Sequence, residues 1–213
     1  MKKTALALGM AAALIAGSAS AHEAGSFIGR LGGVFVSAHN TSNAKTETPV
    51  KLDVNDNAQV GLTLGYMLTD NIGIELLGAT PFAHRVSASI PGSSLGEVVK
   101  LKHLPPSLYV QYYFLDKDAG SRPYIGAGLN YTRFYDAQSL NPAVTNLELK
   151  KHSFGPVINA GIDIKLTDNL YFNTAMWYTK IKTTAKFDAL SKKHEVDVKL
   201  DPFVFFSGLT FSF

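Results

Sequence analysis

The chain ends, at residues 203–213, with the sequence FVFFSGLTFSF. Chain ends are usually polar and frayed, so a run of aromatics up to the last residue indicates an apolar environment. In an extended segment, the apolar side chains share one face and small or polar residues share the other: Phe203, Phe205, Leu209, Phe211 and Phe213 against Gly208, Thr210 and Ser212. This alternation is typical of a strand in the wall of a membrane β-barrel, with an aromatic girdle at its edge.

The same period-two alternation recurs upstream, for example in NAQVGLTLGYML at 57–68. It predicts eight strands, at about 26–38, 57–68, 71–82, 102–115, 122–135, 153–165, 169–181 and 196–213. Short turns at 69–71, 116–121 and 167–169 alternate with long polar segments at about 39–56, 83–101, 136–152 and 182–195. An even strand number with this pattern of connections predicts an all-β, eight-stranded antiparallel transmembrane β-barrel with short periplasmic turns and long extracellular loops.

A soluble exported barrel is the alternative, with its apolar face inward and a charged face in water. The alternate face of these strands is instead rich in Gly, Thr, Asn and Gln, which suits a lumen better than a water-facing surface. The membrane barrel is therefore the favoured interpretation.

The N-terminus carries Lys2 and Lys3, an apolar run, and small residues Ala19 and Ala21 spaced as in an A-x-A cleavage site. This predicts a secretory signal peptide at 1–21 and a mature barrel at 22–213. An N-terminal membrane anchor is the alternative, but the apolar run is shorter than the roughly 20 residues of a spanning helix. Removing both lysines lowers the formal net charge of +3 by two, to +1, so no strong field favours nucleic acid as a partner. The chain has no cysteine, which excludes disulfides and thiolate metal sites.

Several stretches together resemble the OmpW family of small outer-membrane barrels: HEAGSFIGRLG, TDNIGIELLGATPF, HLPPSLYVQYYF, RPYIGAGLNYTRF, WYTKIKTTA and LDPFVFFSGLTFSF. The resemblance covers the mature chain except the long loops. It implies an integral protein of the Gram-negative outer membrane, with a narrow apolar-lined lumen and uptake of small hydrophobic molecules. Some family members are bacteriocin or phage receptors, so a closed structural or receptor barrel that acts through its loops is the alternative function. We expect both termini of the mature chain to be periplasmic.

Strand alternation places opposite charges, Arg30 and Glu75, on the inner wall, where a lone charge would be costly. The pair is interpreted either as a structural plug or as an ion gate. The inner wall also carries apolar residues that a water-filled pore would not use: Leu77, Val157, Trp177 and Phe206. The family resemblance implies that Leu77 and Trp177 constrict the channel. We expect a hydrophobic constriction that admits apolar solutes and dewets against ions, with simple filling of the barrel core as the alternative.

Pro105 and Pro106 fall within the strand expected at 102–115, where a missing N–H removes ladder hydrogen bonds. We therefore expect lateral release of apolar cargo into the membrane near these prolines. The alternative is that they merely begin a strand at the rim.

Catalytic and metal chemistry is weakly indicated. His84 and His103 flank the second long segment, but no spacing orders a nucleophile, a base and an acid, so we expect no enzyme, no cofactor and no metal. A lysine-rich segment at 182–195 is interpreted either as a solvated loop or as a contact for lipopolysaccharide phosphates. The terminal Phe213 resembles the signal that outer-membrane assembly machinery recognises, and we expect its deletion to impair insertion.

Overall fold

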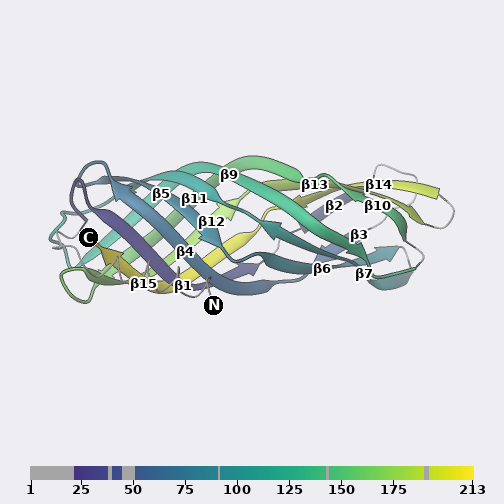
Figure 1. Cartoon of the computed structure of the whole chain (residues 1–213), viewed down its shortest axis with the longest axis horizontal. Helices are drawn as coiled ribbons and strands as arrows, with labels where there is room; N and C mark the ends of the chain where they lie inside the picture. Colours follow the sequence, from purple (N-terminus) through teal and green to yellow (C-terminus); the bar gives the residue numbers. More distant parts are fainter. Residues whose placement is uncertain (1–21, 38–39, 45–50, 91, 143, 190–191) are drawn as a thin grey trace, which may run out of the picture.

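The structure is a computed structural model, and it describes residues 22–213 except 38–39, 45–50, 91, 143 and 190–191. The predicted signal peptide lies outside the described residues. The described part is all-β (Figure 1). Its strands are β1 Phe27–Ser37, β2 Asn40–Ala44, β3 Lys51–Val54, β4 Asn57–Met67, β5 Ile72–Ala79, β6 Phe82–Ile90, β7 Ser93–Leu104, β8 Ser107–Tyr113, β9 Ser121–Ser139, β10 Thr145–Leu149, β11 His152–Lys165, β12 Leu170–Thr179, β13 Ile181–Ala189, β14 Lys192–Leu200 and β15 Phe203–Ser212.

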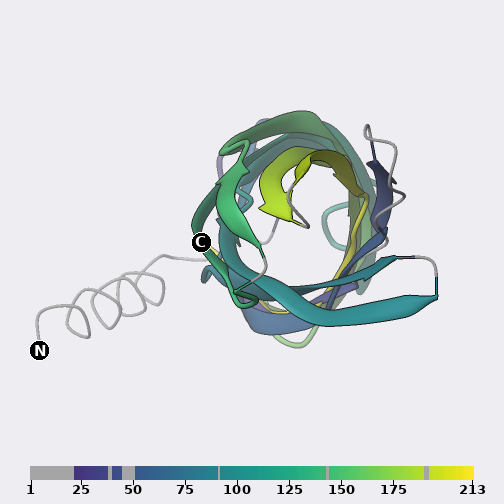
Figure 2. The ribbon, with the colours of Figure 1, turned by 90° about the vertical axis from the view of Figure 1, so that its right-hand side faces the viewer.

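Eight of these strands close into an antiparallel barrel, as the alternation predicts. Around the ring the order is β1, β4, β5, β8, β9, β11, β12 and β15. The ring is closed by β15 against β1, from Ile28↔Ser212 to Ser37↔Phe203. The long β9 pairs with β11 over most of the length of β11. Figure 2 shows the closed ring end-on.

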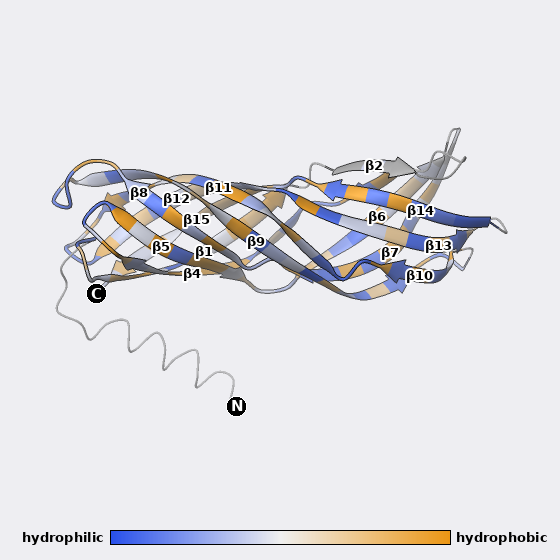
Figure 3. Cartoon of the chain, turned by 90° about the horizontal axis from the view of Figure 1, so that it is seen from above, coloured by the Kyte–Doolittle hydropathy of each residue, from blue (hydrophilic) through white to orange (hydrophobic). Residues whose placement is uncertain are grey.

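The outer wall of the barrel is apolar. Exposed side chains recur on successive strands, among them Leu31, Phe35, Val60, Leu64, Leu108, Ile125, Leu129, Phe154, Ile158 and Leu209. Phe154 is 69% exposed, which in water would be unfavourable for so large an apolar group. Figure 3 shows these hydrophobic positions alternating with hydrophilic ones along the barrel strands. The band is a lipid-facing surface. Among the described residues, no helix has the length and apolar character needed to cross a membrane.

The two ends of the barrel differ. At one end, called the turn end, both Leu-Thr-Asp-Asn sequences form tight turns with the same bonds: Leu68 N donates to Ile72 O at 2.8 Å, and Leu166 N to Leu170 O at 2.9 Å. The other end is called the loop end. There the long connections that the sequence predicts are themselves largely strands, which the alternation did not indicate.

At the loop end, the β6–β7 hairpin, with β3, extends the barrel sheet by pairing with the second half of β9. A separate four-stranded sheet, β10-β13-β14-β2, faces it (Figure 1). These strands form because their inward residues bury a second apolar cluster, which includes Leu52, Val86, Leu101, Phe134 and Val198. The lumen therefore continues beyond the membrane band.

Two of the predicted strands are each divided by proline. The segment expected as one strand at 102–115 is β7 up to Leu104 and β8 from Ser107. The segment expected at 196–213 is β14 up to Leu200 and β15 from Phe203. Proline has no N–H to give to a ladder, so strands end beside Pro105–Pro106 and Pro202 rather than running through them.

The wall is closed tightly where β1 meets β15. Gly32 faces Gly208 in the register, and a Cβ atom at Gly208 would lie 2.3 Å from the Leu31 carbonyl oxygen. Only glycine allows the two backbones to approach this closely.

Candidate functional site: a layered lumen

A network of charged side chains fills the lumen near the turn end. Arg30 of β1 donates from Nη1 to Glu75 Oε2 on β5, and from Nη2 to Asp163 Oδ2 on β11 at 2.7 Å. Two tyrosines of β8 join these groups. Arg30 Nη2 donates to the Tyr113 hydroxyl at 2.9 Å, and the Tyr109 hydroxyl donates to Glu75 Oε1 at 2.6 Å. All five side chains are buried, and both carboxylates are paired.

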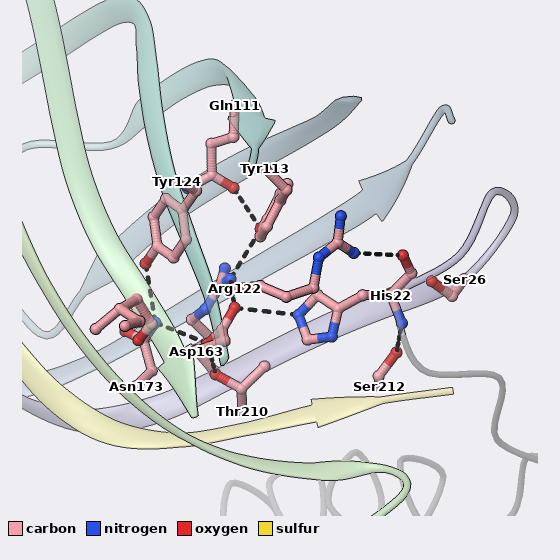
Figure 4. A network of polar contacts seen from close by, with 12 residues as sticks. His22, Ser26, Gln111, Tyr113, Arg122, Tyr124, Asp163, Asn173, Thr210 and Ser212 are labelled. Carbon is pink, nitrogen blue, oxygen red and sulfur yellow. Dashed lines mark hydrogen bonds and ion pairs between the residues drawn. The ribbon is translucent and has the colours of Figure 1, made fainter. Parts of the chain in front are cut away.

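Asp163 connects this network to His22, the first residue that the structure describes (Figure 4). Its Oδ2 lies 3.1 Å from His22 Nε2, and its Oδ1 accepts hydrogen bonds from Asn173 Nδ2 at 2.8 Å and Thr210 Oγ1 at 2.9 Å. Arg122 Nη1 donates to the His22 carbonyl at 2.8 Å. The segment that precedes β1 is thereby held across the turn end of the lumen.

Arg30 and Glu75 thus contact each other, but the sequence analysis did not single out Asp163, Arg122 or His22 as further members of the network. Asp163 could have been found, because it lies on the same strand face as Asn159, which the alternation assigns to the lumen. Arg122 could have been found in the same way, because it lies on the same face of β9 as the buried Tyr124 and Asn130. His22 lies before the first strand, so alternation gives no signal for it.

An aromatic layer lies in the same lumen, with the residues predicted to form the constriction. Trp177 of β12 and Phe206 of β15 are in edge contact, with ring centroids 6.2 Å apart at 87°. Tyr109 lies 6.3 Å from the Trp177 ring, between centroids. Val157 and Leu77 are also buried and belong to the same apolar cluster. The structure therefore brings the four predicted residues together; whether they constrict a channel remains a prediction.

A large apolar cavity occupies the lumen at the loop end. Its volume is about 150 Å³, and its lining includes Val54, Val86, Leu101, Ile181 and Val198. His84 of β6 and His103 of β7 also line it, with their rings stacked at a centroid distance of 4.9 Å and an angle of 6°. No group of three metal-ligating side chains occurs in the part of the chain that the structure describes.

A small cavity of about 30 Å³ lies beside a gap in the wall. Its lining includes Trp177, Pro105 and Pro202. The gap is read from the register: β5 pairs with β8 up to Leu77↔Ser107, and β6 pairs with β7 from Phe82↔His103. Residues 78–81 and 104–106, between these two pairs, have no ladder pairing across this seam. The expectation that Pro105 and Pro106 lie within a strand was wrong; they lie between two strands, at this gap.

On the side that faces β9, the segment of the two prolines is hydrogen-bonded. Tyr131 N donates to Pro106 O at 3.0 Å, and Asn130 Nδ2 donates to Pro105 O at 3.2 Å. The carbonyl groups of both prolines are therefore satisfied by β9, and the missing bonds are those on the side of β5.

The last residue completes the barrel. Phe213 exchanges backbone hydrogen bonds with Phe27 at 2.7 and 3.0 Å, and the two rings stack with centroids 6.1 Å apart. Its position is that of a strand end at the turn end; an assembly role stays a prediction.

Comparison with known proteins gives concordant results. Residues 23–213 match the OmpW family. The chain is 44% identical to outer membrane protein W of Vibrio cholerae over 210 residues, which covers 96% of each chain. It is 37% identical to outer membrane protein W of Escherichia coli K12 over 217 residues, which covers 100% of each. The crystal structure of the outer membrane protein OprG from Pseudomonas aeruginosa is similar in fold, with a TM-score of 0.83 and 34% identity, over 91% of this chain and 98% of that one.

Proposed function

The chain belongs to the OmpW family of outer-membrane β-barrels, and on that premise we propose that it is a passive channel for small hydrophobic molecules. Solutes enter the large cavity from the loop end, outside the cell, and leave sideways into the membrane. The turn end and both termini of the mature chain face the periplasm. The protein carries out no chemical reaction on its cargo.

The large cavity supports the first step. Its described lining is almost entirely aliphatic or aromatic, so a solute gains the transfer free energy of its apolar surface there, about 25 cal/mol per Å² buried. Ions gain nothing in such a cavity and lose their hydration. The cavity therefore selects for apolar molecules without any chemical step.

The charged network supports the lateral exit. A solute moving straight through the lumen would have to separate Arg30 from Glu75 and Asp163, all of them buried. Breaking a buried ion pair costs about 3–5 kcal/mol even when only one partner is lost. The apolar solute offers no replacement hydrogen bonds. The route of lowest free energy therefore avoids the network.

The gap beside Pro105 and Pro106 is the observation that carries the proposal. It lies beside the small cavity, at a seam where ladder pairing is interrupted by residues 78–81 and 104–106. Leu104 and Leu108, on either side of the prolines, are exposed on the lipid face. A solute that leaves here passes from one apolar environment to another.

The test measures uptake of radiolabelled octane by cells whose own copy of the gene is deleted and which express either the wild-type protein or a variant. Cells are needed because a lipopolysaccharide leaflet hinders apolar solutes, whereas a phospholipid bilayer does not. Replacing Pro105 and Pro106 by valine and threonine, which can pair with a neighbouring strand, is expected to slow uptake several-fold. Phe205→Ala, on the lipid face, is the control and leaves uptake unchanged. Unchanged uptake in the proline variant, with normal barrel insertion, contradicts lateral release.

Trp177 tests the constriction separately. Trp177→Ala enlarges the small cavity and is expected to raise both octane uptake and single-channel conductance in reconstituted membranes. An unaltered conductance and uptake in this variant contradicts a constriction at Trp177.

A closed structural or receptor barrel is the second candidate. The buried network favours it, because the same network would also close the lumen of a barrel through which nothing passes. The lysine-bearing strands β13 and β14 would then contact an extracellular partner or lipopolysaccharide. Absence of octane uptake above the level of cells without the barrel supports this candidate over the channel.

A further inference from the structure

Two histidines line the large cavity, although the rest of its lining is mostly apolar. His84 and His103 stack against each other within a ladder of rings that also contains Phe82 and Phe134. Both histidines are buried, His103 with 6% of its surface exposed. Phenylalanine would fill the same space in this ladder without polar atoms. The ring nitrogens are therefore the feature that needs a function.

The hydrogen bonds of the pair leave polar capacity unused. His84 Nδ1 lies 2.8 Å from the Asn55 carbonyl oxygen. Because a carbonyl only accepts, Nδ1 carries the proton, and Nε2 of the neutral ring is left as an acceptor. His103 forms no hydrogen bond within the described chain, and its Nδ1 is enclosed without a partner. A neutral imidazole offers one donor and one acceptor, so His103 has both available.

Other polar groups of the cavity wall are already engaged. His194 Nε2 lies 3.1 Å from the Ala189 carbonyl oxygen, and the Thr183 hydroxyl donates to the Lys150 carbonyl at 2.9 Å. The described lining contains no Asp, Glu, Lys or Arg. A fully charged ligand group would therefore be buried without a counter-charge, which is strongly unfavourable. A neutral group that both donates and accepts matches the free nitrogens.

We propose that His84 and His103 form a hydrogen-bonding site for the hydroxyl group of an otherwise apolar molecule, whose hydrocarbon part fills the large cavity. The proposal rests on the proposed channel and narrows its cargo from hydrophobic molecules in general to apolar alcohols. The hydroxyl donates to one imidazole and accepts from the other. Because an unpaired buried polar group is costly, a plain hydrocarbon leaves the histidines unsatisfied and binds less tightly.

The experiment compares 1-octanol with octane on the full mature barrel in lipid nanodiscs, with ¹⁵N-labelled histidine. Octanol is expected to shift the ring ¹⁵N resonances of His103, and octane to leave them near their ligand-free positions. After correction for partition into protein-free discs, wild type binds octanol more tightly than octane. His103→Phe keeps the ring and the stacking and is expected to reduce this preference about three- to tenfold, the range for a net hydrogen bond. His194→Phe, which alters an engaged ring of the same cavity, keeps the preference.

The outcomes separate this proposal from the channel itself. Equal ¹⁵N shifts with octanol and octane overturn the hydroxyl site, since they indicate displacement of water by either molecule. If the wild type takes up octane but binds octanol no more tightly than octane, the hydroxyl site is overturned while the proposed channel is still supported. The wild-type resonances decide the question even when a variant fails to fold.

Discussion

Replacing Asp163 by asparagine should strongly destabilise the barrel. Asp163 is fully buried and contacts Arg30, His22, Asn173 and Thr210. The substitution keeps the size of the side chain but leaves an excess positive charge in the lumen. Breaking a buried pair in this way costs about 3–5 kcal/mol. The asparagine amide must also displace one of the donors that Asp163 now accepts from.

The measurement is urea unfolding of the barrel in phospholipid vesicles, followed by the fluorescence of Trp177. The matched control is Asp168→Asn, because the Asp168 side chain is 92% exposed and its ion pair with Lys165 lies in a turn. An exposed pair of this kind contributes about 0–1 kcal/mol. The double variant Asp163→Asn with Arg30→Met restores the charge balance and should lose less than the sum of its two single variants. A loss below about 1 kcal/mol for Asp163→Asn, equal to that of the control, would refute the reasoning.

Two other outcomes are expected. Gly208→Val should destabilise the β1–β15 seam by about 1–3 kcal/mol, measured as a shift of the urea midpoint. Gly33→Val is the control and should not shift the midpoint, because no atom lies within 4 Å of a Cβ added there. Equal shifts in the two variants count against the close approach of the backbones. Deleting Phe213 should reduce the amount of barrel inserted in the outer membrane before it changes octane uptake per inserted barrel, and a normal inserted amount on membrane immunoblots speaks against an assembly signal.

The barrel itself could be predicted because lipid on one side and a narrow lumen on the other impose a strict alternation. The side chains of the last strand show this: Phe205 and Leu209 are exposed, while Phe206, Thr210 and Ser212 are buried, as the sequence indicates. The same rule identifies Leu77, Val157 and Trp177 as lumenal. It requires no knowledge of which strands are neighbours.

The loop-end strands could not be predicted in the same way, because water bathes their outer face and polar residues interrupt the alternation. In β6, for example, Arg85 faces solvent and pairs with Glu97, while Val86 is buried in the second cluster. The stacking of His84 on His103 depends on the pairing of β6 with β7, and the gap depends on where two separate ladders end. Such features arise from the register between strands, which one strand alone does not specify.

The charged network and the gap should therefore have separable effects. In the described chain no hydrogen bond joins the network to residues 78–81 or 104–106, and its charged groups pair with one another and with the segment that begins at His22. Weakening it changes the free energy of unfolding but leaves the small cavity and its proline edge in place. Closing the gap adds backbone hydrogen bonds to the wall, so it should stabilise the barrel while it slows the cargo. A variant of Pro105 and Pro106 that is both more stable and slower is the combination that a channel with lateral exit requires and a closed receptor barrel does not.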